Sequence, residues 1–207
     1  MLHRTFRRSL TSAALLGACS AVLGLLPVPA AAVCAANPQG SCRIAERSSL
    51  TLRNDPVDSK DRLNWKWSKG EPTLAAQLAD PTSATDYDLC IYSGAGANLW
   101  PGGSATIPAS GTLWLPTTKG YKYKDKTYAA DGISTAVLRA DPLPSRSSAI
   151  VKGRGPNLPD PTLGLAAADF PLVVQLVNGD TSFCLQSTFL EIDASRNDAT
   201  QLKLKNQ

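Results

Sequence analysis

The sequence predicts an all-β protein, an antiparallel β-sandwich of about nine or ten short strands. Three observations support this fold class. Short stretches alternate between apolar and polar residues, as half-buried strands do. Glycine, proline, asparagine and aspartate separate these stretches. No segment shows the convincing apolar period of an amphipathic helix. The pattern does not distinguish an immunoglobulin-like from a jelly-roll topology.

The clearest strand lies within residues 61–70. Leu63, Trp65 and Trp67 share one face, and the intervening positions are polar or charged, which is the period of a half-buried strand. Gly70 ends it. Because the opposite face is plainly polar, we expect both tryptophans to pack in the core rather than to form a platform for a ligand.

The remaining strands follow from the same alternation and from the turn residues between them. Residues 73–78 lie between prolines and predict a loop or a short helix. Residues 172–177 are apolar at nearly every position, which predicts a central strand covered on both faces, and Asn178-Gly179 predicts a hairpin turn. The strands are expected at 49–53, 87–92, 105–107, 113–115, 121–124, 134–139, 148–153, 172–177, 182–189 and 199–205.

Residues 1–32 have the three parts of a secretory signal peptide. They begin with three arginines, continue with an apolar run from Ala13 to Leu26 and end with three alanines. The alternative is a lipoprotein anchored through Cys19, but the apolar run continues past that cysteine. The protein is therefore expected to be exported, to the periplasm or the extracellular space.

Charge argues against nucleic acid as a partner. The whole chain carries 21 basic and 17 acidic residues, a net charge of +4. Cleavage of the signal removes three arginines, which leaves a net charge of +1. A local excess of lysine occurs only at 119–126, whereas phosphate-rich partners usually need a clustered excess. No second apolar stretch is long enough to span a bilayer.

Four cysteines remain after the signal peptide, Cys34, Cys42, Cys90 and Cys184, and predict two disulfides in an exported protein. Three pairings are possible. One of them closes residues 33–48 through Cys34 and Cys42, in front of a single domain at 49–207. The spacing excludes a zinc site, since no Cys-x-x-Cys pair occurs.

The only histidine, His3, lies in the signal peptide. A Ser-His-Asp triad and a Cys-His nucleophile are therefore absent from the rest of the chain. Paired aspartates of a divergent glycosidase-like hydrolase remain the enzymatic alternative, but most aspartates adjoin turn residues. No catalytic residue is assigned.

Aspartates offer a weak calcium site. Asp55, Asp58 and Asp61 are three residues apart in one loop, and further aspartates flank a loop at 80–88. Neither spacing matches the twelve-residue calcium loop, and the competing interpretation is that these are solvated turn residues. Otherwise no cofactor is expected.

Trp100 and Trp114 are the candidate ligand-binding residues, because both lie near glycine- and proline-rich loops where rings are often exposed. Exposed rings stack on sugars. The sequence thus favours a non-catalytic exported module with a binding or structural role. Carbohydrate binding is the more specific hypothesis. The expected partner is a polysaccharide or a cell-surface component.

Several stretches resemble an uncharacterised family of exported bacterial proteins. They include 63–70, 86–92, 119–126, 152–159 and 174–178. The resemblance covers most of the chain after residue 49, but it implies no activity and identifies no functional residues. Members of that family carry an extra cysteine pair where this chain has 110–115, and they keep counterparts of Cys90 and Cys184. The resemblance therefore implies that Cys90 pairs with Cys184.

Overall fold

The computed structural model describes residues 34–95 and 98–206. The predicted signal peptide and the lipidation alternative at Cys19 lie outside these residues, so both stay predictions. Within the described ranges, no helix has both the length and the hydropathy needed to cross a lipid bilayer.

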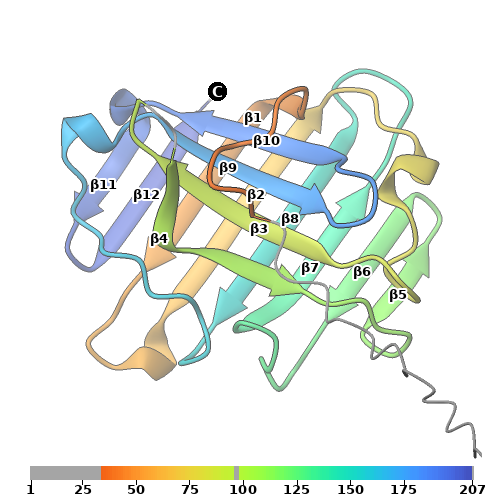
Figure 1. The fold of residues 1–207 in the computed structure, drawn as a ribbon, viewed down its shortest axis with the longest axis horizontal. Helices are drawn as coiled ribbons and strands as arrows, with labels where there is room; N and C mark the ends of the chain where they lie inside the picture. The colour runs from red at the N-terminus through yellow and green to blue at the C-terminus, as the bar shows by residue number, and fades with distance from the viewer. Residues whose placement is uncertain (1–33, 96–97, 207) are drawn as a thin grey trace, which may run out of the picture. The chain divides into compact units, whose positions relative to one another are not determined.

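The described chain forms twelve strands and four short 3₁₀ helices (Figure 1). The predicted all-β class is therefore confirmed. The strands are β1 (Arg43–Arg53), β2 (Arg62–Gly70), β3 (Tyr87–Ser93), β4 (Asn98–Ile107), β5 (Trp114–Thr117), β6 (Gly120–Lys124), β7 (Ile133–Arg139), β8 (Ser147–Arg154), β9 (Leu172–Asn178), β10 (Cys184–Phe189), β11 (Ala194–Asp198) and β12 (Gln201–Asn206). The helices are η1 (Asp58–Lys60), η2 (Ala75–Leu78), η3 (Ala167–Asp169) and η4 (Glu191–Asp193).

The strands form one curled sheet, a half-barrel, in the order β4-β3-β9-β10-β1-β2-β8-β7-β6-β5. The long strand β1 joins its two parts: Arg43 and Ile44 pair in parallel with β10, while Ser48 to Arg53 pair antiparallel with β12. We call β4, β3, β9 and β10 the β9 half, and β11, β12, β1, β2, β8, β7, β6 and β5 the β2 half. The expected sandwich is not confirmed, because the hydrogen bonding is continuous through β1.

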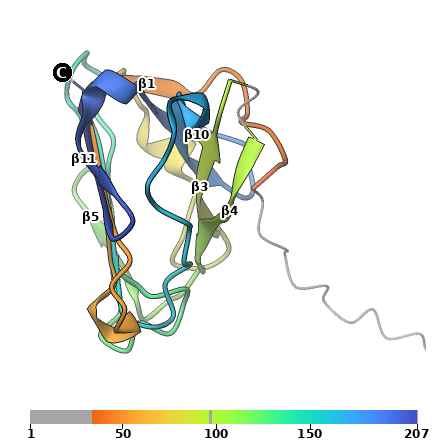
Figure 2. The ribbon, with the colours of Figure 1, turned by 90° about the vertical axis from the view of Figure 1, so that its left-hand side faces the viewer.

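The hydrophobic core lies between the two halves, which face each other in Figure 2. Trp65 and Trp67 of β2 are fully buried in it, which confirms the prediction for that strand. Their indole N–H groups reach across to β10: Trp65 donates to the Ser187 hydroxyl at 3.0 Å and Trp67 to the Gln186 carbonyl at 3.0 Å. Both rings therefore bury their apolar area without leaving the N–H unpaired.

The β9–β10 hairpin was predicted correctly, but its turn is longer than Asn178-Gly179 suggests. β10 begins at Cys184, so residues 179–183 form the connection. Asn178 is buried, and its side-chain oxygen accepts the N–H groups of Asp180 and Thr181 at 3.0 and 3.1 Å. The asparagine thus caps a five-residue turn through its side chain rather than forming a two-residue turn.

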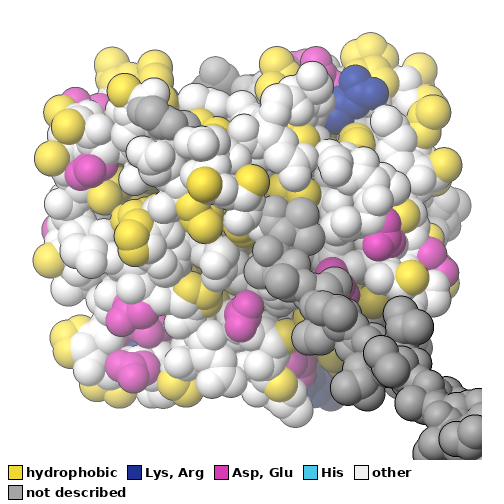
Figure 3. All heavy atoms as spheres, in the orientation of Figure 1, with side chains coloured by type: hydrophobic (Ala, Val, Ile, Leu, Met, Phe, Trp, Pro, Cys, Tyr) yellow, Lys and Arg dark blue, Asp and Glu magenta, His cyan; other side chains and the backbone are white. Residues whose placement is uncertain are grey.

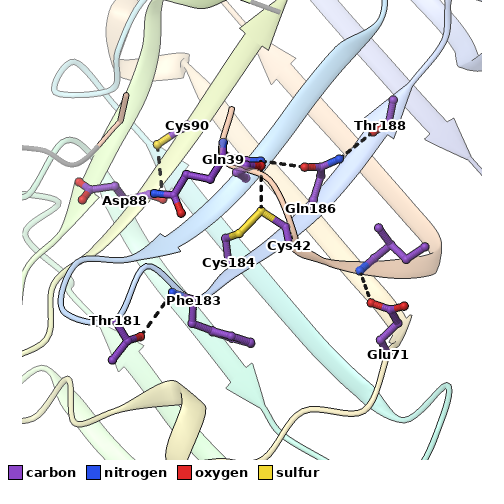
Figure 4. The surroundings of a disulfide bond; sticks show 12 residues. Gln39, Cys42, Glu71, Asp88, Cys90, Thr181, Phe183, Cys184, Gln186 and Thr188 are labelled. Atoms are coloured by element: carbon purple, nitrogen blue, oxygen red, sulfur yellow. Dashed lines mark hydrogen bonds between the residues drawn. A yellow bond between two sulfur atoms is a disulfide. The ribbon is translucent and has the colours of Figure 1, made fainter. Parts of the chain in front are cut away.

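Residues 34–42, the N-terminal strap, cross the outward face of the β9 half and are attached to it at both ends; Figure 4 shows the end at Cys42. Cys34 is bonded to Cys90 of β3, and Cys42 is bonded to Cys184 of β10. All four cysteines therefore form disulfides, as predicted.

The middle of the strap is bound to β9 by a single glutamine. The Gln175 side chain accepts the Gln39 N–H at 3.0 Å and donates to the Gln39 carbonyl at 2.8 Å, in the manner of a paired strand. Beneath the strap lies a second apolar cluster that includes Tyr92, Val173 and Val177. This cover explains why β9 is buried on both faces, as its uninterrupted apolar sequence predicted.

The predicted closure of Cys34 with Cys42 is wrong, and so is the Cys90–Cys184 pairing implied by the family resemblance. β9 lies between β3 and β10, so Cys90 and Cys184 are roughly 10 Å or more apart at the usual strand spacing. A disulfide needs a Cα separation of about 4.4–6.8 Å, and the observed pairs have 5.6 and 4.7 Å. Residues 34–48 are thus no separate closed segment, since both disulfides lead to other strands and β1 begins at Arg43.

Candidate functional site

The two predicted ligand-binding tryptophans are buried, so the expectation of exposed rings is wrong. Trp100 is 7% exposed and Trp114 is 1% exposed. Trp114 is the inward residue of β5, where its ring lies 5.2 Å from that of Tyr123 and its indole N–H donates to the Pro108 carbonyl at 3.0 Å. Proximity to a glycine-rich loop did not decide exposure, because the side chain of a strand residue follows the face of its strand.

The aspartates proposed for calcium serve the turn around η1. Asp61 accepts the N–H of Asp55 at 2.7 Å, and Asp55 accepts the N–H of Val57 at 3.1 Å. The Asp58 carbonyl accepts the N–H of Asp61 and closes the 3₁₀ turn. No group of three side chains suited to a metal ion occurs in the described ranges. The structure therefore favours the interpretation of these residues as turn aspartates.

A small cavity lies between β1 and β2 of one half and β3 and β4 of the other. Asp61 and Asp160 contribute the carboxylates to its lining, beside Leu52, Leu89 and Gly103. Its volume is about 20 Å³, which holds about one water molecule. A carboxylate pair is thus present near a cavity, but a sugar ring does not fit there.

The ionisation of Asp61 opposes folding at neutral pH. Burial raises the pKa of this carboxyl, and the negative charge of Asp160 acts in the same direction. Since its folded-state pKa lies above that of the unfolded chain, stability falls as the pH rises through the folded-state pKa; below about pH 4 the effect is absent.

We expect Asp61→Asn to raise Tm at about pH 7 and to leave it unchanged at about pH 3. The asparagine side-chain oxygen still accepts the N–H of Asp55, so the turn keeps its cap. Thermal unfolding at the two pH values measures the effect. A lower Tm of the variant at neutral pH would contradict it, since it would mean that the ionised carboxylate stabilises the fold.

A larger, open groove lies between the turn after η2 and the edge strand β5; we call it the Tyr121 groove. Its volume is about 500 Å³. Tyr121, on the inward side of β6, is half-buried there and is the accessible aromatic ring. The lining residues are Asp80, Thr82, Gly111, Trp114, Leu115, Pro116 and Tyr121.

The polar side of the groove is held in place by hydrogen bonds. Asp80 Oδ1 accepts the Thr82 hydroxyl at 2.6 Å and the Thr82 N–H at 2.9 Å, and Oδ2 accepts the Ser83 hydroxyl at 2.8 Å. These bonds, led by that from the Thr82 hydroxyl, hold the pKa of Asp80 below its ordinary value. The exposed carboxylate is therefore ionised and oriented, and it keeps acceptor capacity for a ligand.

The groove lining also contains a neutral phenol, that of Tyr121. Burial raises the pKa of Tyr121, and the charge of Asp80 adds to that effect. The Tyr121 hydroxyl thus stays protonated at physiological pH and is able to donate or accept a hydrogen bond. The site combines one aromatic ring, one fixed acceptor and one hydroxyl.

Sequence reasoning found only parts of this groove. The alternation of Tyr121 with Tyr123 predicted a strand, and the sequence Asp80-Pro81-Thr82-Ser83 is typical of a turn capped by its aspartate. Nothing in the local pattern indicates that residues 80 and 121 meet. Comparisons of the chain with protein-family models, with curated proteins and with solved structures find no match.

Proposed function

We propose that the protein is an exported, non-catalytic module that binds carbohydrate in the Tyr121 groove. The observation that carries the proposal is the groove itself, whose lining combines a half-buried tyrosine with an oriented, ionised aspartate. Its volume of about 500 Å³ is within the usual range of small-ligand sites. Sugars present apolar ring faces together with hydroxyl groups, and the groove has a partner for each.

Export is supported by the two disulfides. Structural disulfides persist in oxidising compartments, such as the periplasm and the extracellular space. Here they attach the strap to strands from distant parts of the chain. A protein whose strap is held by two disulfides suits a cell-surface or extracellular role, because these bonds persist in an oxidising environment.

The glycosidase alternative has less support. Glycoside cleavage uses two carboxyl groups on either side of the sugar bond. Asp80 is the only acidic residue in the described lining of the Tyr121 groove. The carboxylates of Asp61 and Asp160 lie together, but their cavity of about 20 Å³ is far smaller than a sugar. Binding is therefore favoured over hydrolysis.

Tyr121→Ala is expected to weaken glycan binding by up to about tenfold, because an aromatic contact contributes about 0.5–1.5 kcal/mol. Asp80→Asn is expected to weaken it as well, by removing the charged acceptor. The measurement is quenching of tryptophan fluorescence by neutral soluble polysaccharides such as xylan, laminarin and pullulan. Trp114 in the groove wall supplies a signal close to the site.

Tyr128→Ala is the matched control, since this half-buried tyrosine lies against Arg154 and not in the groove. It should bind each glycan as the parent protein does. Equal binding by the Tyr121→Ala variant and the parent would refute the groove as the site. Turnover of a glycoside that Asp80→Asn abolishes would contradict the non-catalytic assignment.

A further inference from the structure

Folding gathers the basic residues of the β2 half on one side of the sheet. Along β2 and its neighbours, inward positions are buried and outward positions are exposed or half-buried. We call the outward positions of β12, β1 from Arg47 onward, β2, β8, β7 and β6 the basic face. In the described chain these positions carry lysine, arginine and neutral residues, and no aspartate or glutamate.

The strand register places the charges in rows across the sheet. In the central row, each residue is the register partner of the next across successive strands. The row runs from β12 to β6 through Lys203, Thr51, Asn64, Lys152, Thr135 and Lys124. At the usual strand spacing this row is roughly 24 Å long. Its lysines are exposed, and the side chains between them are hydroxyl or amide groups.

The next row has the same character. It runs from Lys205 through Ser49 and Lys66 to Lys122, with half-buried Ile150 and Val137 between the last two. The two rows together make a broad positive surface rather than a single line of charge. Their spacing along each strand is roughly 7 Å, two residues of a strand.

A third row places like charges directly opposite one another. Arg53, Arg62 and Arg154 are register partners on β1, β2 and β8. Arg53 is paired with Asp55, and Arg62 donates to the backbone carbonyls of Ser59 and Asp61. Arg154 lies over the Tyr128 ring. The three guanidinium groups add positive charge to this end of the basic face.

The acidic residues lie mainly elsewhere. At the edge of the sheet, Asp198 is paired with Arg196 on the same strand. On the side of the domain formed by the β9 half, more Asp and Glu than Lys and Arg side chains are visible, most of them near the margins of the view (Figure 3). The basic face therefore concentrates positive charge locally, although the total charge is small.

We propose that the basic face binds an acidic polysaccharide, one that carries carboxylate or sulfate groups along a flexible chain. The outward side of a curled sheet is convex, and a flexible polymer follows such a surface more readily than a planar bilayer or a stiff duplex. Serine, threonine and asparagine between the lysines suit the hydroxyl groups of a glycan. The ammonium group of a lysine is a point charge, so it binds a carboxylate or sulfate group without requiring a bidentate geometry.

The triple variant Lys66→Gln, Lys124→Gln, Lys152→Gln tests this surface. The probe is alginate, a polymer of uronic acids, with dextran as the uncharged control, and the measurement is titration calorimetry in about 50 mM salt. We expect binding of alginate to be about tenfold weaker than for the parent. The dependence of log K on log salt should be shallower by about 2, since fewer counterions are released.

The control variant Arg43→Gln, Lys60→Gln, Arg146→Gln removes the same charge from residues outside the basic face, since Arg43 precedes the part of β1 that contributes to it. Unchanged alginate binding by this control, together with the loss in the first variant, supports the proposal. Equal weakening in both would overturn it, because net charge alone would then explain binding. Tighter binding to a DNA duplex or to phosphatidylglycerol vesicles than to alginate, at equal salt, would also overturn it.

Binding of an acidic polysaccharide to the basic face does not depend on the Tyr121 groove, and the same set of variants separates the two sites. Tyr121→Ala should bind alginate as the parent does, while the triple lysine variant should bind neutral glycans as the parent does. All the replaced lysines are exposed, so far-UV circular dichroism and Tm should be unchanged. Failure of the parent to bind alginate would refute the basic face and leave the groove untouched.

Discussion

Replacing Cys42 and Cys184 by serine is expected to lower the free energy of unfolding by about 5 kcal/mol. The bond joins residues separated by 142 positions, so its loss frees a very long loop in the unfolded chain. It also releases one end of the strap that covers Val177 on the outward face of β9. Urea unfolding of the oxidised parent and the double variant measures the difference.

The Cys34→Ser, Cys90→Ser variant is the natural comparison. That bond spans 56 positions, for which the same chain-entropy model gives about 4 kcal/mol. We therefore expect both variants to be strongly destabilised, with the longer loop costing more. A loss below about 1 kcal/mol in either variant would mean that its bond does not restrain the unfolded chain.

The pairing itself is open to a direct chemical test. Digestion without reduction, followed by peptide mapping, should recover Cys34 linked to Cys90 and Cys42 linked to Cys184. Recovery of a peptide that links Cys90 to Cys184 would contradict the fold, because β9 separates the strands that carry them.

Trp67→Ala is expected to destabilise the protein by roughly 3–5 kcal/mol, as large-to-small changes in a core do. Trp67 is fully buried, and its indole N–H donates to the Gln186 carbonyl across the core. The ring fills the space above Gly70, where an added Cβ would collide with it. Alanine leaves a cavity there, and the surrounding structure relaxes only partially around such a cavity.

Urea unfolding measures this loss of stability, and two further variants serve as comparisons. Trp67→Phe should cost less than Trp67→Ala, because a ring still fills part of the site. The exposed neighbour Lys66→Ala should change stability by less than about 0.5 kcal/mol. A loss below about 1 kcal/mol for Trp67→Ala would place that ring at the surface and contradict the burial described above.

Local sequence patterns predicted the features that depend on neighbouring residues. The alternation around Trp65 gave both the strand and its inward face, since successive strand side chains point to opposite sides. The continuous apolar run at 172–177 predicted a central strand. Asn178 marked the hairpin, although its side chain caps a longer turn than its sequence signal suggests.

Features that bring distant residues together were missed or predicted wrongly. Asp80 and Tyr121 lie on separate elements, and only the packing of the η2 turn against β5 and β6 makes them one groove. Trp114 was expected to be exposed because of the loop before it, yet its position on the inward side of β5 buries it. Loop composition says little about burial when the residue itself belongs to a strand.

The sequence by itself predicted most of the strands, the inward face of β2, the four disulfide cysteines and the export signal, but not β11. Only the tertiary structure decided which cysteines pair and where the charges gather. A disulfide depends on the distance between strands, and that distance depends on strand order, which no local pattern contains. The basic face could not be predicted from the sequence for the same reason. Its lysines are spread along the chain from Lys66 to Lys205, and they become neighbours only when strand register aligns them.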